Sequence, residues 1–259
     1  LVFAVLLRLG MSGMLHSAKQ RIRSLVMASQ FHPSVAGFLV NPFWLCRRSL
    51  YLKLREYAPR LSGEVLDFGC GTGPYRALLT SASGYIGLEY DCLENRENKR
   101  ADIYYDGVTI PLDDASIDSV LSTQTLEHVP NPEVVVSEWA RVLRPGGHLL
   151  VSVPFMWPEH EMPYDFQRYT TNGLRNILQS SGFMVLSQDR LLCDCRAPAQ
   201  LFCAWIYDSL RFNTRRTAVQ ILLTAALCAP VSLVATALAC VFPKNTHTYL
   251  DNIILAKRM

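Results

Sequence analysis

The stretch Val65-Leu66-Asp67-Phe68-Gly69-Cys70-Gly71-Thr72-Gly73 decides the fold of this chain. It joins a short apolar strand to a loop with three glycines, which let the backbone turn tightly and let a ligand lie against the main chain. The dinucleotide-binding pattern GxGxxG needs its third glycine where this chain has Pro74, one residue after Gly73. Because Asp67 also precedes Gly69 by two residues, the loop favours a nucleoside ligand that carries an ammonium group over one that carries a pyrophosphate.

From residue 64 onward, apolar stretches typical of strands alternate with amphipathic stretches typical of helices. The expected strands are 64–68, 85–90, 102–105, 117–123, 148–153, 183–187 and 251–256. The expected helices are about 74–81, 131–143 and 171–181. This alternation predicts an α/β fold of the Rossmann-like kind, with a seven-stranded, mainly parallel sheet and helices on both faces.

The composition excludes several classes of protein. The chain has 259 residues, 50% of them hydrophobic and 18% charged, which is enough for one α/β domain with additions. A formal net charge of +3 does not indicate a nucleic-acid binder. The 8 cysteines form no CxxC pair and indicate free thiols in a reducing compartment, so we expect a cytoplasmic location, including the cytoplasmic face of a membrane. We expect no metal site, because Cys193-Asp194-Cys195 with Cys203 fits no zinc pattern.

Four segments follow from these patterns. They are an N-terminal helical extension (1–62), an α/β core (63–192), an apolar helical insertion (193–247) and the last strand of the core sheet (248–259). The extension is expected to break at His32-Pro33 and Asn41-Pro42. Its first part carries basic residues at Arg8, Lys19, Arg21 and Arg23.

The insertion contains an uncharged run, 217–243, that is long enough for one transmembrane helix of ~20 residues. A single pass would place the last strand across the bilayer from the rest of its sheet. Pro230 divides the run into two arms, each ~18 Å long as a helix and too short to span the bilayer. We therefore expect a re-entrant or interfacial hairpin, and the alternative is a helical pair packed on the core. The basic residues expected at the headgroups are Arg211, Arg215, Arg216 and Lys244.

Two further acidic positions follow the second and third strands. Glu89 ends the second strand, where an acid accepts hydrogen bonds from ribose hydroxyls. Asp106-Gly107 follows the third strand, where a polar side chain reaches an adenine amino group. Each acid alone is more often only solvated, but their order and spacing after the glycine loop predict S-adenosylmethionine as the ligand.

Four motifs resemble those of the class I S-adenosylmethionine-dependent methyltransferase family, in its methyltransferase-11-like branch. Residues 67–73 resemble motif I, 110–118 the family's LPFxDxSFD, 126–129 its LEHV and 141–147 its RVLKPGG. Leu112 and Ile117 stand where the family usually has phenylalanine. The resemblance covers about 62–190 and implies that ten residues line the cofactor, the last two beside its methionine end. These are Asp67, Gly69, Cys70, Gly71, Gly73, Glu89, Asp106, Gly107, Thr123 and Gln124.

The segment 154–170 is rich in histidine, acids, aromatics and proline, which predicts a shaped loop. It resembles the HxxPYDFxRYT segment of methyltransferases associated with polysaccharide or cell-envelope glycan synthesis. We expect His160, Asp165 and Arg168 to contact the acceptor, with His160 as the base, and His128 is a further catalytic candidate. The alternative is structural: Arg168 pairs with Asp165, His160 caps the loop and His128 only begins a helix.

The predicted reaction is methyl transfer from S-adenosylmethionine to an oxygen of a glycan, a lipid-linked intermediate or another small molecule. We expect no nucleic-acid partner. We do expect peripheral or re-entrant contact with a membrane. Two alternatives stay open: a methyltransferase for a quinone-like lipid, and a non-catalytic module that keeps the fold and binds a partner. Pro74 disfavours a dehydrogenase.

Overall fold

The computed structural model describes residues 31–35, 37–210 and 218–259. The expectations for the basic residues before residue 24, and for Arg211, Arg215 and Arg216, lie outside these residues. The chain forms two compact units, one of Leu1–Tyr51 with Cys195–Lys244 and one of Leu52–Asp194 with Asn245–Met259.

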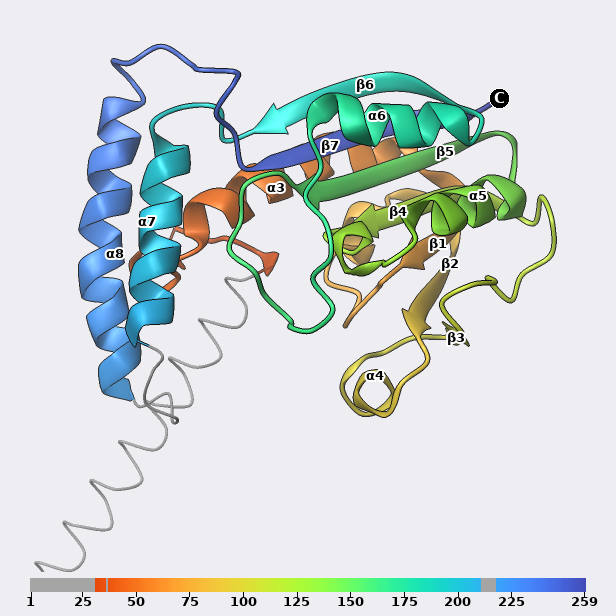
Figure 1. The fold of residues 1–259 in the computed structure, drawn as a ribbon, viewed down its shortest axis with the longest axis horizontal. Helices are drawn as coiled ribbons and strands as arrows, with labels where there is room; N and C mark the ends of the chain where they lie inside the picture. The colour runs from red at the N-terminus through yellow and green to blue at the C-terminus, as the bar shows by residue number, and fades with distance from the viewer. Residues whose placement is uncertain (1–30, 36, 211–217) are drawn as a thin grey trace, which may run out of the picture. The chain divides into compact units, whose positions relative to one another are not determined.

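The second unit is built on a seven-stranded sheet with the strand order β3-β2-β1-β4-β5-β7-β6 (Figure 1). Its strands are β1 (Ser62–Phe68), β2 (Ser81–Tyr90), β3 (Ile103–Tyr105), β4 (Ile117–Thr123), β5 (Leu143–Pro154), β6 (Phe183–Leu191) and β7 (Asp251–Arg258). The first five strands run parallel, and β7 is antiparallel to both β5 and β6. The predicted Rossmann-like, mainly parallel sheet is confirmed. Its strand order reverses between β1 and β4, where the carboxyl ends of the strands form a ligand-binding crevice in such sheets.

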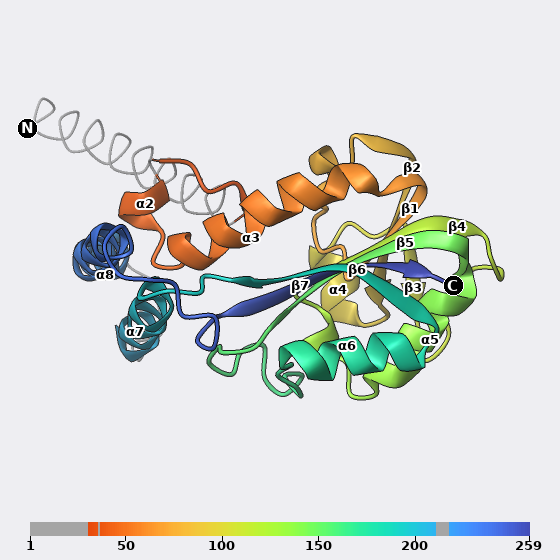
Figure 2. The same ribbon diagram turned by 90° about the horizontal axis from the view of Figure 1, so that it is seen from above.

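Helices cover both faces of this sheet (Figure 2). On one face lie α5 (Pro132–Val142) and α6 (Thr171–Ser180), and on the other lies the second half of α3 (Trp44–Tyr57). In α5 the buried side chains of Val135, Trp139 and Val142 recur at helical spacing, so one stripe of the helix faces the core. The short α4 (Leu93–Asn98) and the 3-10 turn η3 (Leu126–His128) complete the elements next to the site.

The helix predicted over 74–81 is wrong. The structure has only a 3-10 turn, η2 (Arg76–Leu78), and β2 already begins at Ser81. Proline at the start of the segment is compatible with a helix, but the early beginning of β2 leaves too few residues for stable helical turns. The Arg76 guanidinium instead lies over the Tyr85 ring, 4.5 Å from its centroid.

The first unit is helical. It contains α2 (Gly37–Val40), the first half of α3, α7 (Arg196–Ser209) and α8 (Ala218–Leu238), and α7 and α8 lie side by side (Figure 1). Cys203 and Ile206 of α7 pack against Cys228 of α8. The buried Gln200 accepts a hydrogen bond from the Cys46 amide and donates one to the Pro42 carbonyl, so its polar atoms are satisfied.

The expectation that Pro230 divides the apolar run into two arms is wrong, because α8 continues through Pro230 from Ala218 to Leu238. A proline inside a helix removes one backbone N–H and strains the preceding turn. Here the buried Cys228 and Ser232 hold the helix on both sides of it. Among the described residues, no helix has the length and apolar character needed to cross a membrane.

Between β6 and β7 the chain leaves the second unit for residues 195–244, which belong to the first unit. Backbone hydrogen bonds join the points where it leaves and returns. The backbone N–H of Asn245 donates to the carbonyl oxygen of Cys193 at 2.9 Å, and that of Leu250 donates to Leu191 at 3.0 Å. The chain therefore leaves the sheet and returns to it at one place, and β7 then lies between β5 and β6.

Candidate active site

The glycine loop after β1 has a backbone that only glycine adopts without strain. Gly69, Gly71 and Gly73 have φ values of +73°, +59° and +69°. A Cβ on Gly69 would lie 2.3 Å from the Thr125 side chain, whereas a Cβ on Gly71 would meet nothing within 4 Å. The loop after β1 thus touches the segment after β4 at Gly69 and is open at Gly71, which suits close approach by a ligand.

Glu89 holds this loop from the end of β2. Its side chain is buried, and Oε1 accepts a hydrogen bond of 2.6 Å from the Gly71 amide. The other oxygen accepts a bond of 3.3 Å from Asn95 Nδ2, and Lys99 Nζ lies 3.8 Å from Oε1. The predicted ribose-binding acid therefore lies directly against the glycine loop.

Asp67, in β1, is buried and accepts a hydrogen bond of 2.8 Å from the Tyr85 hydroxyl. Burial, together with the nearby Glu89 carboxylate, raises the pKa of Asp67 to about 7, although the hydrogen bond from Tyr85 acts to lower it. Cys70 is also buried, and burial raises the pKa of its thiol to about 12, so it packs beneath the loop as an unreactive group.

The loop after β3 begins with Asp106 and Gly107. Asp106 is exposed, and its Oδ1 accepts hydrogen bonds of 2.8 Å from the backbone N–H groups of Val108 and Thr109. Gly107 has a φ of +89°. Asp106, the acid predicted to reach an adenine amino group, thus stabilises its own turn through one carboxylate oxygen. It lies at the same edge of the sheet as the glycine loop.

Thr123 ends β4, and Gln124 follows with a φ of +53°. The Gln124 amide donates to the Ser152 carbonyl of β5 at 2.8 Å, so the chain turns away from the sheet at this residue. The sequence motifs after β1, β2, β3 and β4 are therefore all brought to the carboxyl edge of the sheet, around the crevice between β1 and β4.

The loop after β5 is fixed by an ion pair between Asp165 and Arg168. The Asp165 side chain is fully buried, and Arg168 Nη1 and Nη2 donate to its two oxygens at 2.6 Å and 2.7 Å. The remaining N–H groups of Arg168 donate to three backbone carbonyls of the same loop, so all five guanidinium donors are engaged. These carbonyls belong to Trp157, Pro158 and Gln167. This arrangement supports the structural alternative for Asp165 and Arg168, which hold the loop.

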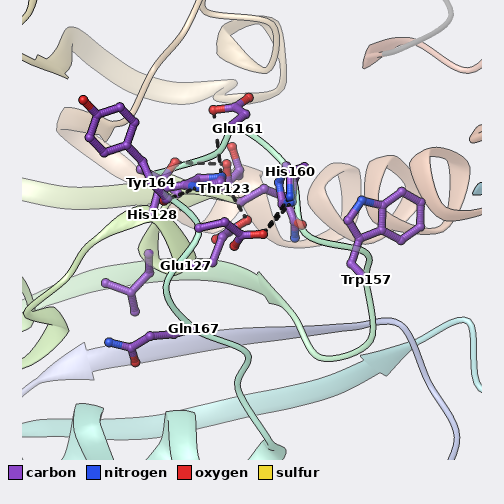
Figure 3. Close-up of polar contacts among 12 residues, drawn as sticks. Thr123, Glu127, His128, Trp157, His160, Glu161, Tyr164 and Gln167 are labelled. Carbon is purple, nitrogen blue, oxygen red and sulfur yellow. Dashed lines mark hydrogen bonds and ion pairs between the residues drawn. The ribbon is translucent and has the colours of Figure 1, made fainter. Parts of the chain in front are cut away.

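His128 and His160 meet at the point where this loop crosses the segment after β4 (Figure 3). Their rings are 4.8 Å apart between centroids, edge to face. His128 Nδ1 lies 2.9 Å from the Tyr164 carbonyl oxygen, and His160 Nδ1 lies 3.2 Å from Asp165 Oδ2. The structure therefore brings both predicted catalytic histidines together, each ring held through Nδ1.

Glu127 lies beside this pair and is a residue that the sequence analysis missed as a site residue. Its side chain is fully buried, and neither carboxylate oxygen has a hydrogen-bond partner among the described residues. Its backbone carbonyl accepts hydrogen bonds from the amides of Phe166 and Gln167, which bring the loop after β5 over it. The available signal was its place next to His128 in the LEHV motif, after the end of β4.

Burial sets the protonation of these groups. It raises the pKa of Glu127 to about 8, and it lowers the pKa of His160, as does the neighbouring His128. Burial also acts to raise the pKa of Asp165, but hydrogen bonds from Arg168 and the His160 amide outweigh it and hold that pKa at about 2. Near neutral pH the cluster thus combines an ionised Asp165 with an imidazole of His160 that is mainly neutral.

Comparisons with known proteins agree with this geometry. Residues 66–151 match the family model described as a methyltransferase domain. A probable S-adenosylmethionine-dependent methyltransferase of Mycolicibacterium smegmatis is 34% identical over 165 residues, which cover 59% of this chain and 63% of that protein. The chain spans about half the length of the curated relatives it matches.

Two solved structures share the fold. A putative sarcosine dimethylglycine methyltransferase from Galdieria sulphuraria has a TM-score of 0.52 at 16% identity, over 82% of this chain and 87% of that one. The [4+2]-cyclase SpnF has a TM-score of 0.51 at 19% identity, over 83% of each chain. Because a fold alone does not assign a reaction, the family rests on the segment from β1 to β5 that the methyltransferase model matches. Residues 66–151 thus match a methyltransferase domain of the class I S-adenosylmethionine-dependent kind, whose cofactor is S-adenosylmethionine.

Proposed function

We propose that this chain binds S-adenosylmethionine and transfers its methyl group to an oxygen atom of an acceptor. The observation that carries the proposal is the loop after β1, in which Gly71 is open on its outer side and is bonded to Glu89. An open backbone with acids at the ends of β1 and β2 suits an amino-acid nucleoside, whose ammonium and ribose hydroxyls are donors. When bound, S-adenosylmethionine supplies an already activated methyl group, so the protein mainly supplies position.

Each predicted cofactor residue has a proposed role that fits its place. Asp67 would take the methionyl ammonium, Glu89 the ribose hydroxyls and Asp106 the adenine amino group. Thr123 and Gln124 would lie beside the methionine end, because Thr123 ends β4, which pairs with β1, and Gln124 follows it. Gly69, Cys70 and Gly73 shape the loop against which the ligand lies.

His160 is the proposed group that takes the proton of the acceptor hydroxyl. Its lowered pKa keeps the ring mainly neutral near neutral pH, as a general base requires. Asp165 and Arg168 are proposed as positioning residues, because they hold each other and the loop that carries His160. His128, whose ring centroid lies 4.8 Å from that of His160, is proposed to contact the acceptor as well.

The proposed acceptor is a glycan, a lipid-linked intermediate or another small molecule with a hydroxyl group. Exposed aromatic side chains on the loop after β5, at Tyr164 and Phe166, support an acceptor with a flat or apolar face. A lipid-linked acceptor, with the protein in peripheral contact with a membrane, is supported by exposed apolar side chains of α8 and the residues after it. These are Leu223, Leu227, Leu233, Val234, Leu238, Val241 and Phe242.

Calorimetric titration of the purified chain with S-adenosylhomocysteine tests the proposal, with NAD as the control ligand. Binding of S-adenosylhomocysteine alone is expected, and it would justify methylation assays that begin with lipid-linked glycans and compare quinone-like lipids. No binding of S-adenosylhomocysteine would reject the proposed enzyme and favour a non-catalytic binding module.

A further inference from the structure

Three metal-ligating side chains converge at the carboxyl edge of the sheet, outside the glycine loop. Glu127, His128 and His160 each offer one donor atom, and these atoms all lie within 4.8 Å of one another. The first two come from η3 after β4 and the third from the loop after β5. The prediction of no metal site rests on the spacing of the cysteines and takes no account of these three side chains. Figure 3 shows the three side chains gathered at one point, with Glu161 beside them.

The hydrogen bonds around the two histidines leave the other ring nitrogen available to a metal. A carbonyl oxygen only accepts, so the Nδ1 of His128, 2.9 Å from the Tyr164 carbonyl, carries the proton. His160 Nδ1 lies 3.3 Å from the Pro158 carbonyl and 3.2 Å from the Asp165 carboxylate, with the same consequence. Both Nε2 atoms therefore keep a lone pair. A carboxylate or carbonyl behind each ring is the usual support of a metal-binding histidine.

Glu127 supplies the second observation that points to a ligand. Its fully buried carboxylate has no hydrogen-bond partner among the described residues, and its Oε1 lies 3.9 Å from His128 Nε2. An unpartnered buried carboxylate is costly unless a proton or a cation neutralises it. Glu161 Oε2, 4.0 Å from the same His128 nitrogen, adds a second acidic side chain on the exposed side of the cluster.

We propose that Glu127, His128 and His160 bind one divalent transition-metal ion, with Zn²⁺ and Co²⁺ as the best-suited ions. Two histidines and one glutamate form a known ligand set of catalytic zinc sites, which leave a fourth position open. Ligands of a tetrahedral ion lie about 3.3 Å apart at metal–ligand distances of about 2 Å, so binding draws the cluster together. The half-exposed ring of His160 is the part of the cluster with room to move.

This inference rests on the proposed methyl transfer and refines its acceptor end. The open position of the ion would take the oxygen of an acceptor hydroxyl and lower its pKa, with the proton passing to solvent. In the metal-bound protein, His160 is a ligand of the ion and no longer the base. The ion then favours loss of the acceptor's proton. The acceptors best suited to the site are therefore those whose hydroxyl, alone or with a neighbouring one, can ligate a metal.

The test is a titration of the EDTA-treated, dialysed full chain with CoCl₂, followed by visible absorption and by calorimetry. The expected result is one Co²⁺ per chain with the intense absorption of tetrahedral nitrogen and oxygen ligation, displaced by Zn²⁺. Glu127→Gln and His160→Ala should each weaken binding at least 10-fold. The matched control His247→Ala, an exposed histidine of the same unit, should not.

Besides an absence of Co²⁺ binding, two outcomes would overturn the metal site. One is Co²⁺ affinity that is unchanged in both Glu127→Gln and His160→Ala. The other is an absorption spectrum of thiolate ligation, which would place the ion on the cysteines. Binding of S-adenosylhomocysteine to the same samples separates the two proposals: if it persists without Co²⁺ binding, the metal site fails and the methyltransferase does not. Normal affinity for it in the variants also shows that they are folded.

Discussion

The Gly71 amide donates a hydrogen bond of 2.6 Å to the Glu89 carboxylate, which ties the loop after β1 to the end of β2. Glu89→Ala removes this bond and the proposed ribose contact together. We expect the affinity for S-adenosylhomocysteine to fall at least 10-fold, because a hydrogen bond to a charged group contributes about 1.5–3 kcal/mol. Calorimetry measures the change, and Glu94→Ala, an exposed acid of α4, is the control. Equal affinity in the two variants would exclude Glu89 from the cofactor site.

Asp67 makes the stability of the ligand-free protein depend on pH. Its folded-state pKa of about 7 lies above the ordinary value of 3.8, so between these pH values the unfolded chain loses a proton that the folded chain keeps. The free energy of unfolding therefore falls as pH rises from about 4 to 7 and is level above. Asp67→Asn removes the ionisable group, so the free energy of unfolding of the variant should not fall over this pH range. Relative to the parent, the variant should therefore gain stability as pH rises, by about 4 kcal/mol at most. Urea denaturation at pH 4.5 and pH 8 without ligand measures it.

Asp106→Asn is the opposite control for this experiment. Hydrogen bonds from the Thr109 and Val108 amides lower the pKa of Asp106, so its carboxylate stabilises the fold above the ordinary pKa and this contribution is lost as pH falls. The asparagine variant should therefore lose stability relative to the parent at pH 8. A gain in both variants would mean that the effect does not come from the burial of Asp67.

His160→Ala should lower kcat by about 100-fold or more, the range by which a positioned proton-transfer group accelerates a reaction. The affinity for S-adenosylhomocysteine should be unchanged, because His160 belongs to the loop after β5 and not to the glycine loop. His247→Ala is the control. A kcat equal to that of the control would show that His160 takes no part in the reaction, either as base or as metal ligand.

Arg168→Ala should destabilise the second unit by at least about 2 kcal/mol, because it leaves the buried Asp165 carboxylate without its ion pair. The acceptor KM should rise, while the affinity for S-adenosylhomocysteine should not change. The comparison for stability is Arg175→Ala on α6, which loses exposed hydrogen bonds to Gln188 of β6. Equal denaturation midpoints in the two variants would contradict the role assigned to Arg168.

Much of the fold could be predicted from local pattern. The strand at 117–123 and the helix at 132–142 match within a residue, because apolar spacing and the residues that begin or end each element agree there. The errors at η2 and Pro230 arose where a proline was given too much weight. Whether a proline starts or breaks a helix depends on the length of chain available and on packing around it, which are properties of the folded protein.

In the site, too, some features could be predicted from local sequence and others depend on the folded protein. The residues proposed to hold the cofactor could be placed at one edge of the sheet because each lies at or just after the end of a parallel strand. The ion pair between Arg168 and Asp165 could be proposed as the structural alternative, because the two residues are close in sequence. Glu127 could not be recognised, because its burial is created by the loop after β5, whose Phe166 and Gln167 bind its carbonyl. A buried, unpaired carboxylate is visible only once those segments have met.

The hydrogen bond between the Asn245 amide and the Cys193 carbonyl also has a consequence for the design of variants. Because the chain departs from the sheet and rejoins it through adjacent backbone groups, the register of β6 and β7 does not depend on what lies between them. Such a place tolerates domain insertion. The segment with α7 and α8 could therefore be exchanged, shortened or removed without displacing the strands that carry the glycine loop.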